Sequence, residues 1–321
     1  MATMNAVQID NFGGPEVLHL RRLPIPQPRQ GEYLVKIRAA SVNPVDYKIR
    51  SGKYPEVKAE MLPYILGRDL AGEVVEAGAG ADKFRAGDQI YALLGIDRGA
   101  YGEYAIVKET EAARSPKSLK LEIAAAVPLA ALTAWQGLFR YGNLRPGQAV
   151  LIHAGSGGVG HFAIQFAKAK GAFVATTVSA EHADFVKTLG ADQVIDYKQQ
   201  RFENEIQDVD MVFDLIGGET QDRSWGVLRH GGIMVSTLSR PSPEKADKYG
   251  VRAMRYTAAA SSSELAEIAE LIDAGKVKPV VSKTFGLQDA AAAGSYIQQG
   301  HTQGKVVLSV GQGSTMETTF I

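Results

Sequence analysis

The sequence predicts an α/β protein with two domains, a small β domain followed by a doubly wound parallel sheet. From Asn5 to about Leu121, short alternating apolar segments are broken by Gly and Pro, as in Tyr33–Arg38 and Gly72–Glu76. This pattern is typical of antiparallel strands in a barrel-like domain. After Ala149, apolar runs of strand length alternate with helical stretches, which predicts a parallel sheet covered by helices on both faces.

The second domain is predicted in order along the chain. Its expected strands are Ala149–Ala154, Phe173–Val178, Gln193–Ile195, Val209–Leu215 and Gly232–Thr237. Its expected helices are Val159–Lys170, Ala180–Leu189 and Thr220–Leu228. A last helix at Glu264–Ala274 leads to a final strand at Val306–Val310, which could return to the first domain. The polar tail from Gly311 is predicted to be disordered.

Composition and charge favour small-molecule chemistry. Lys plus Arg and Asp plus Glu number 35 each, and no basic block is present, so binding to nucleic acid or to anionic membranes is not expected. The chain has no cysteine, and its six histidines are scattered without the spacing that pairs two imidazoles on one helical face. No metal site is therefore predicted.

The N-terminal stretch Met1–Asp10 lacks the pattern of a secretory signal. The most apolar stretch, Ile123–Leu132, has ten residues and contains Pro128, fewer than the ~20 residues needed to cross a bilayer. The sequence therefore predicts a protein without a membrane span, located in the cytoplasm.

A glycine-rich loop follows the first strand of the second domain. Residues 155–160 read Gly-Ser-Gly-Gly-Val-Gly and open the next helix. Gly155 allows a sharp turn, Gly157 lets the backbone approach a pyrophosphate, and Gly160 lets helix and strand pack closely. The helix N-terminus offers free amides to the phosphates. A glycine loop alone is weak evidence, but this placement predicts a Rossmann dinucleotide site made by Gly155, Ser156, Gly157, Gly158, Val159 and Gly160.

The choice between NAD and NADP depends on the end of the next strand, where an acidic residue would hold the ribose 2′-hydroxyl. Here Ala175–Ser179 contains no carboxylate, so a 2′-phosphate is tolerated. Ser179 could donate a hydrogen bond, His182 could add positive charge, and Tyr197 could donate its hydroxyl. NADPH is therefore the predicted cofactor, although Ser179 and His182 could instead simply begin a surface helix.

With these residues in view, the chain resembles the quinone oxidoreductase branch of the medium-chain dehydrogenase/reductase superfamily, up to Val310. The marker is a set of residues at the spacing of that branch: Gly147, Gln148, Leu151, Gly155–Gly158, Gly160, Gln165 and Lys168. Further matches lie at 41–46, 50–52, 132–135 and 304–305. The resemblance implies a GroES-like catalytic domain over 1–123, a Rossmann domain over 124–262, a return over 263–310, a disordered tail over 311–321, and a homodimer.

Zinc-dependent alcohol dehydrogenases of this superfamily carry a cysteine ligand, a hydroxyl proton relay and a histidine ligand at three characteristic positions. This chain has Asn43, Val45 and Arg68 there, and it also lacks the four-cysteine structural zinc lobe. The resemblance therefore implies a zinc-free enzyme that reduces an acceptor already electrophilic enough to take hydride without a metal.

Two residues are the candidates for catalysis, which requires a group that stabilises the oxyanion formed on reduction. By resemblance, the Asn43 amide lies near the nicotinamide ribose, orients the ring and binds the oxyanion; alternatively it is a turn residue before Pro44. By resemblance, a lysine at position 48 is typical of the alkenal and enone reductase subgroup. Its ammonium could stabilise the oxyanion and supply a proton. Lysine side chains also commonly point into solvent, so a surface position without a catalytic role stays open for Lys48.

The remaining candidates would bind substrate or cofactor. Tyr47 and Tyr54 offer stacking faces for a flat substrate, or pack in the β domain. By resemblance, Thr133 bonds the nicotinamide amide. The resemblance also places Ile216, Leu238, Ser239 and Lys305 in the cofactor groove.

Together these features predict NADPH-dependent reduction of small quinones or α,β-unsaturated carbonyls by direct hydride transfer. The proton would come from Lys48, the ribose hydroxyls or water. Two alternatives stay open, an enoyl-thioester reductase and a non-catalytic NADPH-binding sensor. The sequence does not indicate the natural electron acceptor.

Overall fold

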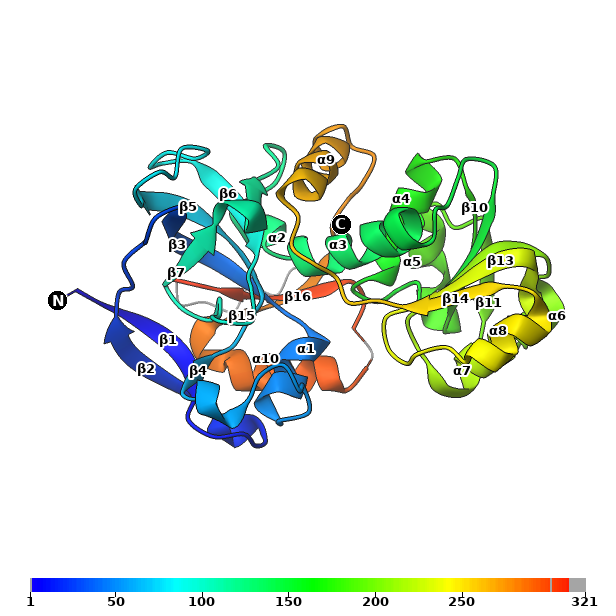
Figure 1. Ribbon diagram of the computed structural model, residues 1–321, viewed down its shortest axis with the longest axis horizontal. Coiled ribbons are helices and arrows are strands. Elements are labelled where there is room, and N and C mark those ends of the chain that lie inside the picture. Colours follow the sequence, from blue (N-terminus) through cyan, green and yellow to red (C-terminus); the bar gives the residue numbers. More distant parts are fainter. Residues whose placement is uncertain (1, 301, 312–321) are drawn as a thin grey trace. The chain divides into compact units, whose positions relative to one another are not determined.

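The computed structural model describes residues 2–300 and 302–311, and the chain divides into two compact units (Figure 1). The first comprises Met1–Leu129, Ala260–Asp273 and Pro279–Ile321, and the second comprises Ala130–Ala259 and Ala274–Lys278. The sequence places the domain changes after residues 123 and 262. Residues 312–321 of the predicted disordered tail lie outside the described residues.

The first unit is built mainly from antiparallel strands. Its strands are β1 (Thr3–Ile9), β2 (His19–Pro24), β3 (Glu32–Val42), β4 (Tyr64–Ile65), β5 (Asp69–Ala77), β6 (Gln89–Leu93), β7 (Tyr104–Lys108), β8 (Ala112–Arg114), β15 (Val281–Gly286) and β16 (Lys305–Ser309). Its α-helices are α1 (Pro44–Arg50), α2 (Leu121–Ala124), α9 (Ser262–Asp273) and α10 (Ala290–Gln298). Short 3₁₀ turns lie at Pro15–Val17, Ala59–Met61, Glu109–Glu111 and Leu287–Asp289.

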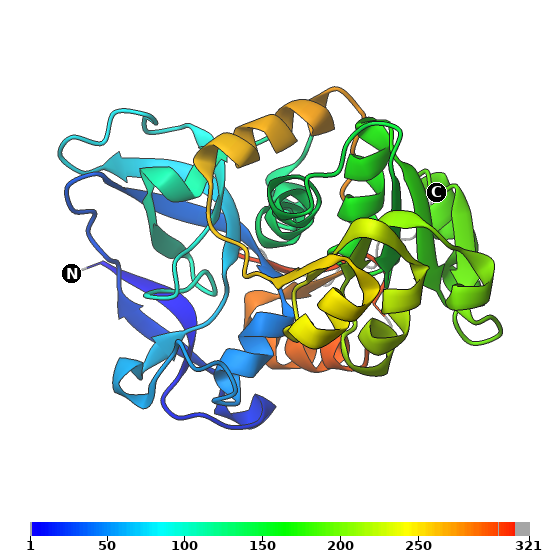
Figure 2. The same ribbon diagram turned by 45° about the vertical axis from the view of Figure 1, so that its right-hand side comes forward.

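The main sheet of this unit joins both ends of the chain. Its strands run in the order β15-β16-β3-β5-β6-β8, with β7 also paired to β3, while β2, β1 and β4 form a second sheet. β16 pairs antiparallel with the second half of β3, so the final strand returns to the first domain, as Figure 1 shows in red beside blue. Inward-facing residues of β3, such as Tyr33, Val35 and Ile37, are buried in one apolar core. Helix α10 packs against α1 in the same unit (Figure 2).

The second unit is the predicted parallel α/β domain. Its strands are β9 (Ala149–His153), β10 (Phe173–Val178), β11 (Gln193–Asp196), β12 (Val209–Asp214), β13 (Leu228–Ser236) and β14 (Arg252–Arg255). Its helices are α3 (Pro128–Trp135), the π-helix η4 (Gln136–Tyr141), α4 (Gly160–Ala169), η5 (Ala180–His182), α5 (Ala183–Thr188), α6 (Phe202–Glu205), α7 (Gly218–Arg223), η6 (Ser224–Val227) and α8 (Pro243–Tyr249).

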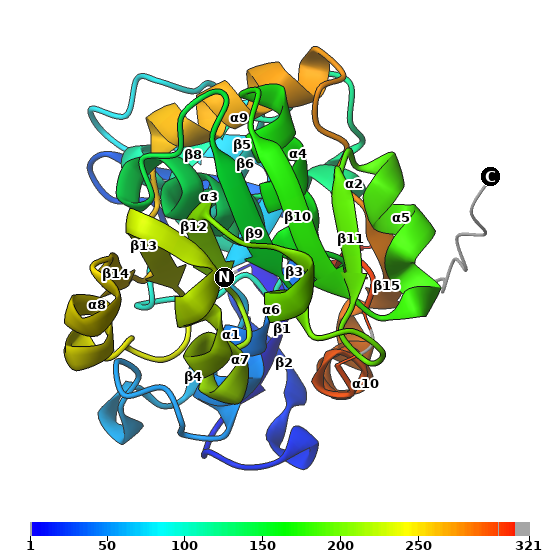
Figure 3. The same ribbon diagram turned by 90° about the vertical axis from the view of Figure 1, so that its right-hand side faces the viewer.

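The strands of this unit run in the order β11-β10-β9-β12-β13-β14 (Figure 3). All neighbouring pairs are parallel, and the chain builds outward from β9 in both directions. In open parallel sheets, ligands bind at the carboxyl ends of the strands where this order reverses. The glycine loop follows β9 and lies at that point.

The predicted elements of this unit agree with the structure in type, and they differ mainly at one place. The helix expected over Thr220–Leu228 ends earlier, as α7 followed by η6, and β13 already begins at Leu228. The sequence analysis placed no elements at α8 and β14. Helix α8 begins with the Ser242 side chain accepting a hydrogen bond from the Lys245 amide, ahead of Pro243, which is a helix-start pattern.

Candidate functional site

The glycine loop is tightly constrained by its own backbone. A Cβ at Gly155 would lie 2.1 Å from Thr176 Oγ1, and one at Gly160 would lie 2.2 Å from the Ala154 carbonyl oxygen, so both positions require glycine. A Cβ at Gly157 would meet only the Ala154 oxygen, at 3.4 Å, an ordinary contact. Space beside Gly157 is therefore left open, as an approaching phosphate requires. Ala154 itself has φ 56°, a left-handed conformation that costs roughly 1 kcal/mol.

Several amides of this loop are available to a ligand. Within the described part of the chain, the backbone N–H groups of Ser156, Gly158, Val159 and Gly160 have no hydrogen-bond acceptor. They precede or open α4, where unpaired amides and the helix dipole favour an anion. A pyrophosphate therefore fits the residues present, with Gly157 giving it room.

The loops at the carboxyl ends of β10, β11, β12 and β13 carry most other predicted cofactor residues. Ser179 follows β10, Tyr197 follows β11, Ile216 follows β12 and Leu238 follows β13. Three of these large side chains are unusually exposed, Tyr197 at 57%, Ile216 at 49% and Leu238 at 41%. Because parallel strands end at one edge of the sheet, these side chains and the glycine loop share that edge. Exposed apolar groups at such an edge mark a binding surface.

One buried carboxylate, Asp214, organises two of these loops. Its Oδ1 accepts hydrogen bonds from the amides of Ile216 and Gly217, at 3.0 and 2.8 Å. Its Oδ2 accepts from Gln221 Nε2 and Ser236 Oγ, both at 2.8 Å.

The two residues that donate to Asp214 Oδ2 extend the network to the next loop. Ser236 Oγ accepts from the Leu238 amide at 3.2 Å, and Gln221 Nε2 donates to the Ser239 carbonyl at 3.2 Å. Asp214 thus connects the predicted cofactor residues Ile216, Leu238 and Ser239. The sequence analysis did not identify it, although an aspartate ending a buried apolar strand before Ile-Gly-Gly is a visible signal.

The turn after β10 carries a carboxylate, Glu181, that was not among the predicted site residues. Ser179 Oγ donates to Glu181 Oε1 at 2.8 Å. His182 Nε2 and Lys198 Nζ each lie 4.0 Å from the same oxygen. The predicted phosphate-binding residues Ser179 and His182 are therefore brought together around Glu181, with Lys198 as an additional cation.

In the first unit, Asn43 lies in a buried polar cluster. Its Nδ2 donates to Asp69 Oδ2 at 2.9 Å and to Ser41 Oγ at 3.2 Å, and its Oδ1 accepts from Lys305 Nζ. Asn43 is only 3% exposed, and both of its amide hydrogens are engaged within the protein. An oxyanion would have to displace one of these bonds to reach the amide. Lys305, predicted in the cofactor groove, is here the partner of Asn43.

Opposite charges are buried together around this cluster. Lys305 Nζ lies 4.0 Å from Asp69 Oδ2, and the two side chains are 4% and 0% exposed. Burial lowers the pKa of Lys305, opposed by the neighbouring Asp69 and Asp46 carboxylates. Because each charge loses its hydration, removing one partner would leave the other uncompensated.

Asp46 lies in the first turn of helix α1 and shares this environment. Its Oδ2 accepts from the Asn43 amide at 2.7 Å and from Tyr101 Oη at 3.0 Å, whereas its Oδ1 is buried without a partner among the described residues. Burial raises the pKa of Asp46 to about 7, aided by the negative charge of Asp69. Asp46 therefore caps the N-terminus of α1, the helix that carries Lys48.

Helix α1 and the segment after it position the predicted substrate residues. Lys48 is partly exposed, and its ammonium has no hydrogen bond or ion pair within residues 2–300 and 302–311. Tyr47, one position earlier, is half-buried, and burial raises its pKa. Tyr54 packs against the apolar core of this unit. Lys48 is thus a cation of helix α1 that is available to a ligand, and the more exposed Lys53 and Lys58 follow it in the chain.

Thr133 lies on α3 at the start of the second unit. It is 8% exposed, and its carbonyl accepts a hydrogen bond from Tyr256 Oη. This contact fixes the backbone of the segment against β14 and the loop after it.

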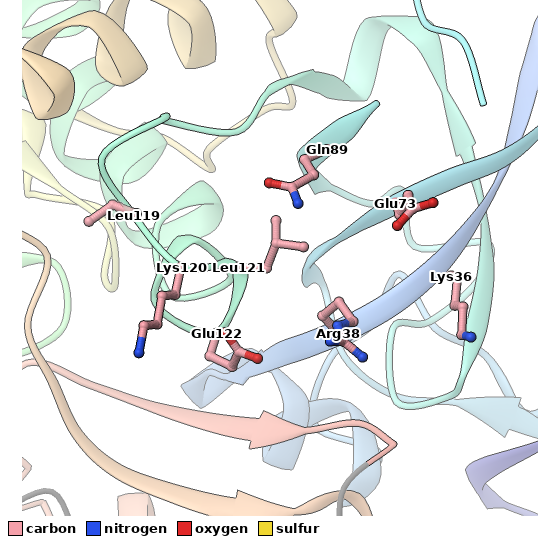
Figure 4. A pocket seen from close by; sticks show the side chains of 8 residues that line it. All are labelled: Lys36, Arg38, Glu73, Gln89, Leu119, Lys120, Leu121 and Glu122. Atoms are coloured by element: carbon pink, nitrogen blue, oxygen red, sulfur yellow. The ribbon is translucent and has the colours of Figure 1, made fainter. Parts of the chain in front are cut away.

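A separate pocket of about 400 Å³ lies in the first unit (Figure 4). It is lined by Lys36, Arg38, Glu73, Gln89, Leu119, Lys120, Leu121 and Glu122, and it includes none of the predicted site residues. Its basic and acidic side chains are mixed and mostly exposed.

Two further findings concern the described residues alone. They contain no group of three or more His, Cys, Asp or Glu side chains arranged to hold a metal ion. Within the same residues, every helix is too short or too polar to cross a bilayer.

The chain matches two family models. The alcohol dehydrogenase GroES-like domain matches residues 29–117, and a model described as zinc-binding dehydrogenase matches residues 189–308. The second description covers a family that includes metal enzymes, whereas this chain contains no cysteine to serve as a zinc ligand.

Curated relatives align over nearly the whole chain. The mitochondrial NAD(P)H oxidoreductase RTN4IP1 of Danio rerio is 34% identical, over 96% of this chain and 91% of its own length. The chloroplastic NADPH-dependent alkenal/one oxidoreductase of Arabidopsis thaliana is 35% identical, over 95% of this chain and 79% of its own length.

Solved structures give the same result. A quinone oxidoreductase from Coxiella burnetii superposes with a TM-score of 0.90 and 37% identity, covering 96% of this chain and 100% of the other. The Escherichia coli quinone oxidoreductase, solved in complex with NADPH, superposes with a TM-score of 0.87 and 30% identity, covering 95% and 99%.

The predicted cytoplasmic location is wrong by this comparison, because relatives are named mitochondrial or chloroplastic. The prediction depended on the lack of a secretory signal and of a membrane-spanning stretch. Neither feature bears on organelle import, since transit peptides have their own composition and are not part of the fold.

Proposed function

Because the chain belongs to the quinone oxidoreductase branch of the medium-chain dehydrogenase/reductase superfamily, whose members here are NAD(P)H-dependent oxidoreductases, we propose that it uses NADPH to reduce quinones or α,β-unsaturated carbonyls. The observation that carries the proposal is the group of unpaired amides at Ser156, Gly158, Val159 and Gly160, beside the open space at Gly157. When bound, the reduced nicotinamide supplies a hydride.

The chain's own residues have separate tasks in this proposal. The glycine loop holds the pyrophosphate, and the loops organised by Asp214 present Ile216 and Leu238 to the cofactor. Asn43 acts as a positioning residue, because its amide is already bonded to Ser41, Asp69 and Lys305.

Lys48 is the proposed catalytic residue for the substrate oxygen. Its unpaired ammonium can stabilise an oxyanion and then donate a proton to it, without breaking an existing ion pair. Tyr47, on the same helix, offers an aromatic face to a flat acceptor.

The test monitors NADPH and NADH oxidation against quinones, 2-alkenals, enones and enoyl thioesters. Lys48→Ala should lower kcat on the best acceptor by roughly 100-fold, the usual effect of losing a general acid. Lys58→Ala, which removes an exposed lysine of the same unit, serves as control. Unchanged turnover in Lys48→Ala would remove the proposed role of this residue. Turnover on enoyl thioesters alone would favour a thioester reductase, and NADPH binding without any turnover would favour a sensor.

The homodimer that the resemblance implies stays a prediction. Light scattering of the purified chain at several concentrations tests it, with a mass near twice 34.4 kDa expected.

A further inference from the structure

Three different side chains converge on one oxygen at the end of β10. Glu181 Oε1 accepts a hydrogen bond from Ser179 Oγ at 2.8 Å, and His182 Nε2 and Lys198 Nζ lie 4.0 Å away. The loops that carry them are joined by the backbone, since the Tyr197 amide donates to the Val178 carbonyl at 3.1 Å. This arrangement therefore brings the ends of β10 and β11 together around a carboxylate.

The partners of this oxygen are the groups that a phosphate monoester binds. A hydroxyl donor, an ammonium and an imidazole that is cationic when protonated form charge-assisted bonds to phosphate oxygens. Ser179 and His182 follow β10, the second strand of the Rossmann unit, where the substituent on the adenosine ribose is recognised, and Lys198 follows the neighbouring β11. A carboxylate at this position repels a 2′-phosphate, and it can accept a hydrogen bond from a free 2′-hydroxyl.

We propose that Glu181 sets the cofactor selectivity of this chain by occupying the donors that a ribose 2′-phosphate requires, which restrains the preference for NADPH and keeps NADH usable. The inference rests on the proposed function, because it assumes that the glycine loop binds a nicotinamide nucleotide. Ser179 is 6% exposed and fixed in place, whereas the side chains of Glu181 and Lys198 are each 58% exposed. Glu181 can therefore swing away when a phosphate takes its donors.

A second carboxylate lies near Lys198, and it limits how far a substitution of Glu181 can change the charge of this site. Asp196 Oδ1 accepts from the Lys198 amide at 3.0 Å, so a second carboxylate remains beside Lys198 in any Glu181 variant. Removing the charge of Glu181 thus leaves the hydrogen bond between Asp196 and the Lys198 amide in place. It reduces the repulsion of a ribose 2′-phosphate, while the Asp196 carboxylate keeps one negative charge near the site.

The test measures the dissociation constants of NADPH and NADH by calorimetry in Glu181→Gln and in the parent chain. Glutamine keeps an oxygen for the Ser179 hydroxyl and removes the charge. We expect the ratio of the NADH constant to the NADPH constant to rise roughly tenfold, since each unit-charge repulsion near 4 Å is worth about one order of magnitude or less in water. Glu205→Gln, an exposed glutamate of the same unit, should leave the ratio unchanged.

A second variant tests the donors themselves. Lys198→Ala should weaken NADPH binding roughly tenfold at low salt and leave NADH binding within twofold, with a smaller effect at high ionic strength.

Distinct outcomes separate the two claims. Unchanged selectivity in Glu181→Gln, with both nucleotides still bound, would overturn this inference and leave the proposed function intact. A parent chain that binds neither nucleotide would overturn both.

Discussion

Two carboxylates, one in each unit, show how differently this fold treats buried charge. Asp214 in the second unit accepts four hydrogen bonds, two from backbone amides and two from side chains. Asp46 in the first unit has one oxygen bonded to the Asn43 amide and Tyr101, and one buried oxygen without a partner within the described residues. Buried polar groups are normally satisfied, and each exception calls for an explanation.

The difference in hydrogen bonding indicates that the two carboxylates hold their surroundings in different ways. The Asp214 network fixes backbone, so it holds the loops at the sheet edge in one conformation. The Asp46 environment combines Asp69, Lys305 and Tyr101, where the balance of charge depends on protonation. The cluster that holds α1 should therefore respond to pH.

The largest effect is expected from Lys305→Met. This change leaves the Asp69 carboxylate buried without its cation and removes the partner of Asn43 Oδ1. Breaking a buried ion pair in this way costs about 3–5 kcal/mol of unfolding free energy. Urea unfolding measures it, with the exposed Lys276→Met as control. A loss below about 1 kcal/mol would mean that the cluster is solvated and not buried.

A smaller loss is expected from Asp214→Ala. The substitution leaves four donors without their acceptor, and some will recover water at the sheet edge, so we expect a cost of about 2–3 kcal/mol. Asp214→Asn should cost less, because its oxygen still accepts from the Ile216 and Gly217 amides. The same urea titration compares the two. Equal stability of the Ala and Asn variants would contradict the role of those two amide bonds.

A third effect is a change in pH dependence. The pKa of Asp46 is about 7 in the folded chain against an ordinary 3.8, so the folded state holds this proton more tightly. Its contribution to stability is complete below pH 3.8 and is lost as pH rises through about 7. Asp46→Asn removes this titration, so the difference in unfolding free energy between variant and parent should change across that window. A constant difference would contradict the raised pKa.

The alternation of strands and helices in the second unit and the glycine loop could be predicted because each depends on local pattern. Strand–loop–helix alternation and the Gly155–Gly160 spacing are visible in the letters, and the structure contains these elements. The Asp214 network could not be predicted in the same way, since Ser236 meets Asp214 only through the pairing of β12 with β13, and Gln221 reaches it from helix α7.

The cluster around Asn43 could not be predicted either, because its members are still farther apart in the sequence. Lys305 is separated from Asn43 by most of the chain, and the pairing of β16 with β3 brings them together. Glu181 was overlooked for a different reason. A ribose-binding acid is expected at the end of the strand, within residues 175–179, whereas Glu181 lies two positions beyond Ser179.

The central claim is that the glycine loop binds a nicotinamide dinucleotide, and Gly157→Ala tests it most directly. The added Cβ makes only an ordinary contact of 3.4 Å with the Ala154 oxygen, so folding should be preserved, unlike in Gly160→Ala, whose Cβ would lie 2.2 Å from that oxygen. Calorimetric titration of Gly157→Ala with NADPH should show an affinity at least roughly tenfold lower than that of the parent chain, with an unchanged Tm. Full NADPH affinity in this variant would contradict the account.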